Sequence, residues 1–254
     1  MIVTWQQLGN FGNCMFEYTA ARLFAEKFNY ELKTDINFNG KDTNCEEFFT
    51  EFFDLEDKHN LPIESFVGIY DDELDKILNY TEEEFKNSKY YNKNVRMEGY
   101  FQDPSIFIDK EVNKFFKFDE SKLIPVNDED LCVSLRIGSD YKSLNFCIDS
   151  DIITNLIDSL WYNRLVIVAD EQDSEYLKHF DKYNATIVTN DSKKPIKDFY
   201  TLMSFKNLII PNSTFSYWAA VLGKANTIYA PKDWKFSKLN DIVTKVDKTI
   251  LYSI

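Results

Sequence analysis

The sequence has few of the residues that bind metal ions or nucleic acids. Only two histidines and four cysteines occur among its 254 residues. Cys14, Cys45, Cys132 and Cys147 are scattered and form no Cys-x-x-Cys pair, so the spacing of a metal site is absent and free thiols are predicted. Basic residues number 29 against 42 acidic ones, a formal charge of -13. That balance argues against a nucleic-acid or anionic-membrane surface, whereas a phosphate-bearing small molecule needs only one local basic group.

Long apolar runs are also missing. None approaches the length of a membrane span, and the first residues lack the basic region and apolar core of a signal peptide. The sequence therefore predicts a cytoplasmic protein without a transmembrane segment. A hydrophobic content of 44%, with 16% aromatic residues, is ample for a packed core in one large domain or two smaller ones.

The first part of the chain begins like a βαβ unit. A short strand over 2–5 is followed by a Gly/Asn loop over 8–13 and a helix in which Phe16, Leu23 and Phe28 recur at helical spacing. Residues 46–94 are acidic and aromatic, with Phe48, Phe49, Phe52, Phe53 and Leu55 among carboxylates. Helices are predicted over 71–79 and 82–87, and the carboxylates are interpreted as solvated faces.

A second alternation of strands and helices begins near Leu131. Strands are predicted over 131–135, 165–169, 185–188, 208–210 and 227–230, with helices over 152–161, 174–180, 199–204 and 217–222. This pattern is typical of an α/β fold with a parallel sheet, whose ligands bind at the carboxyl ends of the strands. The polar stretch 119–130 is the natural linker, which predicts domains over 1–125 and 126–254.

The segment 207–223 runs from a buried type of strand, through hydroxyl residues, into an apolar helix closed by Gly223. Ser213, Thr214 and Ser216 are expected where that helix begins. Their hydroxyls and the unpaired N–H groups of the first turn can bind a phosphate, which the helix dipole also favours. The same residues are equally typical of an ordinary N-cap.

Charged residues follow two other strands of the predicted sheet. Arg136 comes directly after one strand, where it needs an anionic partner: a diphosphate, or an ion pair with Asp140 or Asp170. Asp170 and Asp198 are candidate acceptors for a ribose or a purine edge, and each is equally suited to cap a helix. An arginine, a hydroxyl cluster and two carboxylates gathered by one parallel sheet indicate a nucleoside-diphosphate site.

These residues resemble a known family, the fucosyltransferases that use GDP-fucose, and most closely the α-1,2-fucosyltransferases of bacteria and viruses. Five segments match in order along the chain. They are Gly12-Asn13-Cys14-Met15-Phe16-Glu17-Tyr18, Glu98-Gly99-Tyr100-Phe101-Gln102, the stretch from Asp198 to Ser204, the stretch from Asn212 to Ala220, and the stretch from Ala230 to Trp234. The family has Gly-Asn-Gln-Met-Phe-Gln-Tyr at the first and Gly-Tyr-Phe-Gln at the second.

The resemblance implies a GT-B-like fold with two Rossmann-like lobes, the acceptor glycan on the first and GDP-fucose on the second. It implies inverting transfer of fucose, in an α-1,2 linkage, without a metal ion or other cofactor. The donor-binding residues that it implies are Gly12, Arg136, Asp170, Asp198, Asn212, Ser213, Thr214, Phe215 and Ser216. The region 40–94 matches no known segment and is expected to govern the choice of acceptor.

One segment departs from the family. The donor signature His-x-Arg-Arg-x-Asp is replaced by Ser134-Leu-Arg136-Ile-Gly-Ser-Asp140, without the histidine and the second arginine. The surviving Arg-x-Gly-x-Asp is similar to the signature of the protein O-fucosyltransferases, whose arginine contacts the donor diphosphate. Arg136 keeps that role, while the acceptor, and with it the sugar, is left open between these classes and other GDP-sugar transferases.

The catalytic base is also left open. Asp140, Glu98 and Glu17 are candidates, and Asn13 is a candidate for holding a sugar through its amide. Two other interpretations remain. Asp149-Ser150-Asp151 matches the metal-binding Asp-x-Asp of GT-A transferases, although it also precedes a predicted helix as a cap does. The altered signature is also consistent with an inactive relative that binds a nucleotide or glycan.

Overall fold

The computed structural model describes residues 1–35, 50–53, 58–59, 66–103, 107, 111–172, 174–189, 195–232 and 248–253. These form two compact units, Met1–Phe118 and Asp119–Ile254. The polar stretch 119–130 begins the second unit. Cys14, Cys132 and Cys147 are free thiols, as predicted. Phe48, Phe49, Leu55 and Cys45 lie outside the described residues, as do Asp233 and Trp234 at the end of the last family-like segment.

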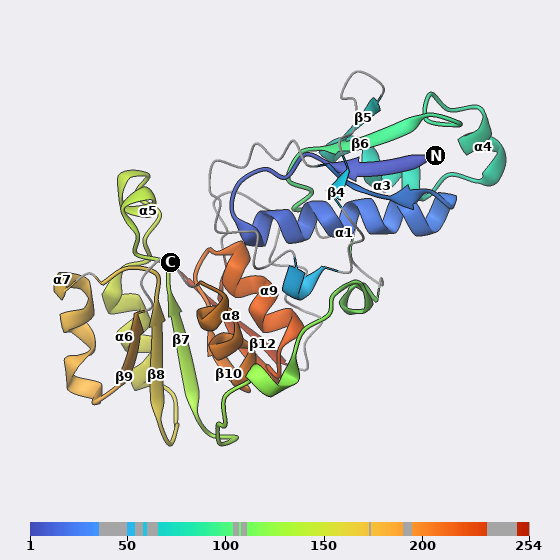
Figure 1. Cartoon of the computed structure of the whole chain (residues 1–254). Coiled ribbons are helices and arrows are strands. Elements are labelled where there is room, and N and C mark those ends of the chain that lie inside the picture. Colours follow the sequence, from blue (N-terminus) through green and yellow to red (C-terminus); the bar gives the residue numbers. More distant parts are fainter. Residues whose placement is uncertain are drawn as a thin grey trace. The chain divides into compact units, whose positions relative to one another are not determined.

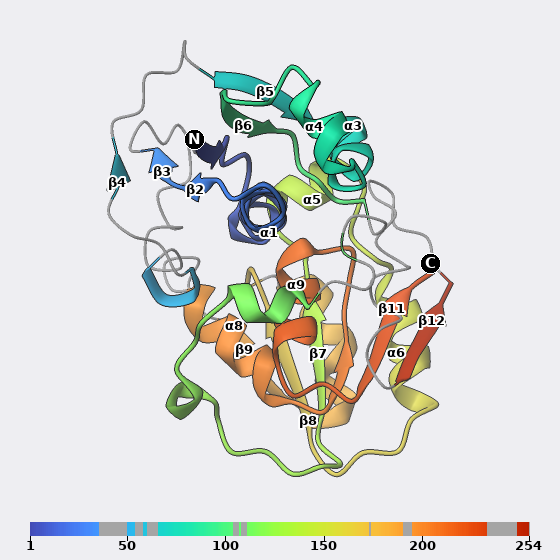
Figure 2. The ribbon, with the colours of Figure 1, turned by 90° about the vertical axis from the view of Figure 1, so that its right-hand side faces the viewer.

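The first unit contains a parallel sheet of strand order β2-β1-β6-β5. Its strands are β1 (Ile2–Trp5), β2 (Glu31–Leu32), β5 (Phe66–Tyr70) and β6 (Asn94–Glu98), and a separate pair joins β3 (Thr34–Asp35) to β4 (Lys58–His59). The predicted helices near 71 and 82 are α3 (Asp71–Leu78) and α4 (Glu82–Lys86), followed by a 3-10 turn at Val112–Phe115. Figure 2 shows β5 and β6 running side by side.

Helix α1 (Phe11–Phe28) is buried on nearly all sides, so its apolar residues do not form a single stripe. It packs on β1 and β6. The helix begins earlier than predicted: Gly12 and Asn13 lie in its first turn and not in a loop. The turn before it is formed by Gly9 at φ +70°, where a Cβ would lie 2.4 Å from the Asn13 amide.

The second unit is a six-stranded parallel sheet of order β12-β11-β10-β7-β8-β9. Its strands are β7 (Leu131–Leu135), β8 (Leu165–Ala169), β9 (Thr186–Thr189), β10 (Asn207–Ile209), β11 (Thr227–Pro231) and β12 (Lys248–Tyr252). The helices are α5 (Ser139–Ser143), α6 (Ser150–Asp158), α7 (Ser174–Leu177), α8 (Pro195–Ser204) and α9 (Thr214–Leu222), with 3-10 turns at Glu120–Lys122 and Lys178–Tyr183. The predicted α/β class is confirmed, and β7 and β8 have the predicted bounds.

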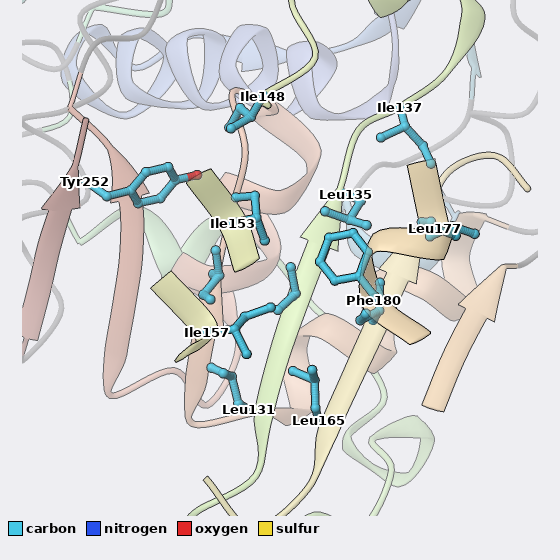
Figure 3. Packing of buried hydrophobic residues seen from close by; sticks show 14 residues of the cluster. Leu131, Leu135, Ile137, Ile148, Ile153, Ile157, Leu165, Leu177, Phe180 and Tyr252 are labelled. Carbon is cyan, nitrogen blue, oxygen red and sulfur yellow. The ribbon is translucent and has the colours of Figure 1, made fainter. Parts of the chain in front are cut away.

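Helices cover both faces of this sheet because side chains alternate along each strand. Leu131 and Leu135 of β7, with Leu165 of β8, face α6, and Figure 3 shows Ile153 and Ile157 of that helix pointing toward them. Ser134 lies on the opposite face, where its hydroxyl meets α9. Helices α8 and α9 pack against each other. The odd-numbered residues of β7 therefore lie on the α6 face of the sheet, and Ser134 lies on the α9 face.

The strand order identifies where a ligand is expected. Relabelled by position in the chain, the order is 6-5-4-1-2-3, which read from the other edge is the doubly wound order 3-2-1-4-5-6. The winding reverses between β7 and β10, which lie side by side with Asn207 opposite Leu131. In such sheets ligands bind outside the carboxyl ends of the strands at this reversal. Figure 1 shows β7, β8 and β9 on one side of it.

Candidate functional site

Residues 136–141 and 210–216 follow the two strands at this reversal, and they meet there. The hydroxyls of Ser134 on β7 and Ser216 on α9 lie 2.7 Å apart. The Tyr141 hydroxyl donates a hydrogen bond of 2.8 Å to the backbone carbonyl of Asn212. The structure thus brings Arg136, Asp140 and Asp170 into the same sheet edge as Asn212 and the hydroxyl cluster.

Ser213 is the N-cap of α9. Its backbone is extended, and its Oγ accepts a hydrogen bond of 3.4 Å from the Ser216 amide. Thr214 and Phe215 form the first turn, where both are half-buried, and the Phe215 ring packs edge-on against Phe199, 5.0 Å between centroids. The predicted helix start is confirmed, and so is the capping interpretation of Ser213.

Arg136 makes ion pairs with both of its predicted carboxylate partners, Asp170 and Asp140. Its guanidinium also lies 4.6 Å from the centroid of the Tyr141 ring, within the range of a cation–π contact. One positive charge therefore faces two carboxylates. The arginine that follows a buried strand is satisfied electrostatically by residues of its own sheet edge.

The two carboxylates are held differently. Asp170 accepts backbone hydrogen bonds from Ile137 at 2.7 Å and Gly138 at 3.3 Å, in addition to its pair with Arg136. It therefore fixes the turn after β7 and does not cap a helix. Asp140 is paired with Arg136 on the exposed side, where its side chain is 53% accessible against 22% for Asp170. A Cβ at Gly138 would lie 2.8–2.9 Å from both carboxylates, so a side chain at this position requires one of them to shift.

Asn212 is buried, with 4% of its surface exposed. Among the residues that the structure describes, neither its amide nitrogen nor its amide oxygen has a hydrogen-bond partner. Buried polar atoms are nearly always paired, and each exception requires an explanation such as a missing ligand. The side chain carries both a donor and an acceptor at the reversal of the sheet.

Asp198 was expected at the head of a helix. Helix α8 instead begins at Pro195, which places Asp198 in its first turn with 7% of its surface exposed. Of the two alternatives for Asp198, the helix cap does not fit its position, because Pro195 is well suited to open a helix and starts it three residues earlier. Its role as an acceptor for a ribose or a purine edge stays a prediction. The alternative Asp-x-Asp segment does form a cap: Asp149 accepts a hydrogen bond of 2.9 Å from the Asp151 amide.

The remaining candidates lie in the first unit. The Asn13 amide oxygen accepts a hydrogen bond of 3.0 Å from the Gln102 side chain. Both carboxylate oxygens of Glu17 accept from the Leu8 amide, at 2.9 and 3.0 Å. Glu17 is fully buried, and this burial raises its pKa to about 9 against the backbone bonds that lower it. At neutral pH, Glu17 therefore carries a proton.

Glu98, at the end of β6, is bound by Arg96. One carboxylate oxygen accepts from the Arg96 Nε at 2.9 Å and from its terminal nitrogen at 2.5 Å. Gly68 on β5 lies opposite Arg96, and a Cβ there would come within 3.0–3.3 Å of the Glu98 carboxyl group. The ion pair occupies the space that this glycine leaves.

Sequence reasoning did not select Ser134 or Tyr141 as site residues. Ser134 is recognisable only as a hydroxyl on the polar face of a buried strand, and Tyr141 only by its position after the Arg-x-Gly-x-Asp segment. Their partners, Ser216 and Asn212, are 82 and 71 residues away in the chain. The signal that finds them is the pairing of β7 with β10, which requires the strand order.

The chain belongs to the glycosyl transferases of family 11, whose family model matches residues 2–245. It is therefore a glycosyltransferase, as predicted. A search of curated proteins finds no match to the sequence. The solved structures that it resembles include several fucosyltransferases.

The fucosyltransferase NodZ from Bradyrhizobium is 14% identical, with a TM-score of 0.53, 87% of this chain covered and 93% of that one. A variant of Arabidopsis thaliana FUT1 in complex with GDP is also 14% identical, with a TM-score of 0.54 and coverage of 92% and 71%. POFUT1 in complex with GDP-fucose is 10% identical, with a TM-score of 0.55 and coverage of 100% and 97%. These likenesses establish the GT-B-like fold that the sequence predicted. Among the described residues, no helix is both long and apolar enough to span a bilayer.

Proposed function

We propose that this glycosyltransferase moves L-fucose from GDP-β-L-fucose to a hydroxyl of a glycan acceptor, with the GDP bound by the second unit. The observation that carries the proposal is the group of ligands at the reversal between β7 and β10: Arg136, the unpartnered amide of Asn212 and the capped start of α9. The proposed donor residues of the second unit are Arg136, Asp170, Asp198 and 212–216; Gly12, which the resemblance also implied, lies in the first unit. Membership of family 11 and the GDP and GDP-fucose bound by structures of the same fold support it.

A diphosphate can bind at Arg136 only if one of the two carboxylates paired with it gives way. A donor diphosphate carries at least two negative charges, and it would meet an arginine already compensated by two carboxylates. Asp140 is the more exposed of the two, and exposed ion pairs are worth at most about 1 kcal/mol. In the proposal the diphosphate takes the place of Asp140 at Arg136, while Asp170 stays bound to the Ile137 and Gly138 amides.

The reaction proposed is a single in-line displacement with inversion at the anomeric carbon. The bond between that carbon and the diphosphate oxygen breaks as the acceptor oxygen bonds to the carbon, and negative charge accumulates on the departing GDP. Arg136, the Ser213 and Ser216 hydroxyls and the dipole of α9 all favour that charge. One well-placed donor of this kind lowers the activation barrier by roughly 3 kcal/mol. These groups supply the stabilisation in the absence of a divalent metal ion.

The acceptor side is proposed on the first lobe, over 1–125, with the α-1,2 linkage of the family that the sequence resembles. Among the candidate bases, Glu17 is the least suited, because its buried carboxyl group retains its proton at neutral pH. One oxygen of Glu98 is engaged by Arg96. Asp140 becomes available when a diphosphate replaces it at Arg136, which makes it the preferred candidate. Its proposed role as base needs the acceptor hydroxyl to come within hydrogen-bond reach.

A cytoplasmic location of the protein also stays a prediction.

A panel of nucleotide sugars tests the proposal. Thermal unfolding is followed with GDP, GDP-fucose, GDP-mannose, UDP-glucose and CDP, and fucose release and transfer are measured with and without excess EDTA. We expect a rise in melting temperature with GDP and GDP-fucose and turnover that persists in EDTA. Loss of turnover in EDTA contradicts metal independence. Stabilisation by UDP-glucose alone contradicts the proposal that GDP-fucose is the donor.

A second function, binding without turnover, follows from the departure in the donor signature. It predicts stabilisation by GDP with neither transfer nor hydrolysis of GDP-fucose for any acceptor. Lipid-free oligosaccharides and a peptide with serine and threonine hydroxyls serve as the acceptor panel. Transfer of fucose to the peptide alone favours a protein O-fucosyltransferase. Transfer of another GDP-linked sugar favours a GDP-sugar transferase of a different donor specificity.

A further inference from the structure

The donor site of the proposed function is spanned by Tyr141, a residue that touches both of its halves. The tyrosine lies on α5, on the β7 side of the sheet reversal. Its ring packs against the Arg136 guanidinium at 4.6 Å, and its hydroxyl donates to the Asn212 carbonyl at 2.8 Å. One side chain thus links the arginine that follows β7 to the loop that follows β10.

We infer that Tyr141 is a positioning residue that sets the separation between Arg136 and the α9 phosphate site before the donor arrives. The inference rests on the proposed function. The link is rigid at both ends: a tyrosine side chain has two rotatable bonds, its ring is held against Arg136, and its oxygen is bonded to a backbone atom. Because Asn212 immediately precedes the cap residue Ser213, holding its carbonyl also orients the start of α9.

The position of Asn212 strengthens the inference. Its side-chain amide is buried and has no hydrogen-bond partner within the described part of the chain, so no hydrogen bond of the side chain fixes its direction. The Tyr141 bond is made by the backbone of the same residue. Fixing that carbonyl therefore aims the unpartnered amide, which makes Tyr141 relevant to ligand binding as well as to the stability of the loop.

The chain offers a matched control on the same loop. The hydroxyl of Tyr252 on β12 donates to the Ile210 carbonyl at 2.8 Å, two residues before Asn212. Both bonds join a tyrosine hydroxyl to a backbone oxygen of the loop after β10. Only Tyr141 also contacts Arg136. If the tyrosines simply stabilise the loop, removing either hydroxyl will have the same effect on ligand binding.

The test compares Tyr141→Phe, Tyr252→Phe and wild type at a temperature where all are folded, by calorimetric titration with GDP and with guanosine, and by donor kinetics. Loss of one hydrogen bond to a backbone carbonyl predicts a GDP affinity roughly three- to tenfold weaker for Tyr141→Phe, with little change for guanosine. Its KM for the donor rises correspondingly. Tyr252→Phe lowers the melting temperature and leaves GDP affinity within about twofold of wild type.

The inference is overturned if Tyr141→Phe binds GDP as wild type does, or if Tyr252→Phe weakens GDP binding equally. If wild type does not bind GDP, the proposed function itself is wrong. Failure of the proposed function is therefore distinguishable from failure of the Tyr141 inference. Should Tyr141→Phe not fold, a fluorinated tyrosine at the same position keeps the ring and makes the hydroxyl more acidic. Its GDP affinity must then fall as pH is raised through the ionisation of that hydroxyl, and a flat profile overturns the inference.

Discussion

The hydroxyls of Ser134 and Ser216 are hydrogen-bonded at 2.7 Å, and both residues are buried. This contact fastens the middle of the sheet to the first turn of α9 at the point where the chain reverses its winding. Removing one partner leaves a buried hydroxyl without its bond, which costs about 1–3 kcal/mol, whereas removing both leaves no orphan.

Ser134→Ala and Ser216→Ala are therefore expected to be non-additive. Each single variant loses about 1–3 kcal/mol of unfolding free energy, and the double variant loses less than the sum. Urea denaturation of the four proteins measures the coupling. Additive losses indicate that the two hydroxyls do not depend on each other, which contradicts the contact.

Two substitutions of Ser213 distinguish its role as a helix cap from its proposed role in phosphate binding. Ser213→Ala removes the cap and costs about 1 kcal/mol of stability. Ser213→Asp keeps an oxygen acceptor at the cap and adds a negative charge that suits the helix dipole, so stability is retained. The same charge repels a diphosphate, and GDP affinity falls at least roughly tenfold by the Coulomb term at partly buried distances.

Thermal unfolding and GDP titration are measured together on the two Ser213 variants. Asp149→Ala is the control, since Asp149 caps α6 in the same way. That variant should lose stability while binding GDP normally. Ser213→Asp binding GDP as tightly as wild type would mean that the start of α9 is capped and nothing more.

Asp140→Asn should tighten GDP binding. The substitution removes the exposed carboxylate that competes for Arg136, and an exposed pair of about 0.5–1 kcal/mol corresponds to a gain of roughly two- to fivefold. Asp170→Asn has the opposite expectation, because Asp170 also holds the Ile137 and Gly138 amides. If Asp140→Asn weakens GDP binding, the carboxylate does not compete with the diphosphate. Fucose transfer by Asp140→Asn at saturating donor reports separately on its role as a base.

Glu17 makes stability fall with rising pH. Its pKa in the folded protein is raised by burial to about 9, whereas in the unfolded chain it is near the ordinary value of 4.5. Below the unfolded value, both states are protonated and no stability is lost. Between the two values, the unfolded chain releases the proton and the folded protein keeps it, so unfolding becomes more favourable with each pH unit.

Glu17→Gln removes this dependence while keeping one acceptor for the Leu8 amide. At pH 8 the variant is expected to be more stable than wild type by at least about 1 kcal/mol, or roughly 2–4 °C in melting temperature for a chain of this size. The advantage shrinks toward pH 5. Melting curves from pH 5 to pH 9 check it, and an advantage that is independent of pH contradicts the shifted titration.

The sequence predicted the core of the second unit well, since β7 and β8 are continuous buried runs with clear ends. It was less successful at helix starts. Helix α1 begins at Phe11, inside the loop predicted over 8–13, and Pro195 opens α8 ahead of Asp198. The N-cap at Ser213 was predicted because capping is local chemistry.

The bonds that assemble the candidate site are not local. Arg136 was expected to bind a diphosphate or to pair with Asp140 or Asp170. It pairs with Asp140 four residues along the chain, and with Asp170 because β8 lies in register beside β7. The Tyr141 bond to Asn212 depends on β10 lying beside β7, which no single-sequence pattern specifies. Residue types indicated the ligand, while strand order determined which residues meet.

The pairing of β7 with β10 also determines when the sheet can be completed during synthesis. Leu131 is paired with Asn207, so during synthesis the central strand remains an exposed edge until the ribosome has made about another 75 residues. Before that moment the chain holds β7, β8 and β9 but lacks α9, the helix proposed to bind the donor phosphates. A nascent chain interrupted between these strands would present an unpaired apolar edge and would lack half of the proposed donor site, so aggregation and loss of that site would have the same cause.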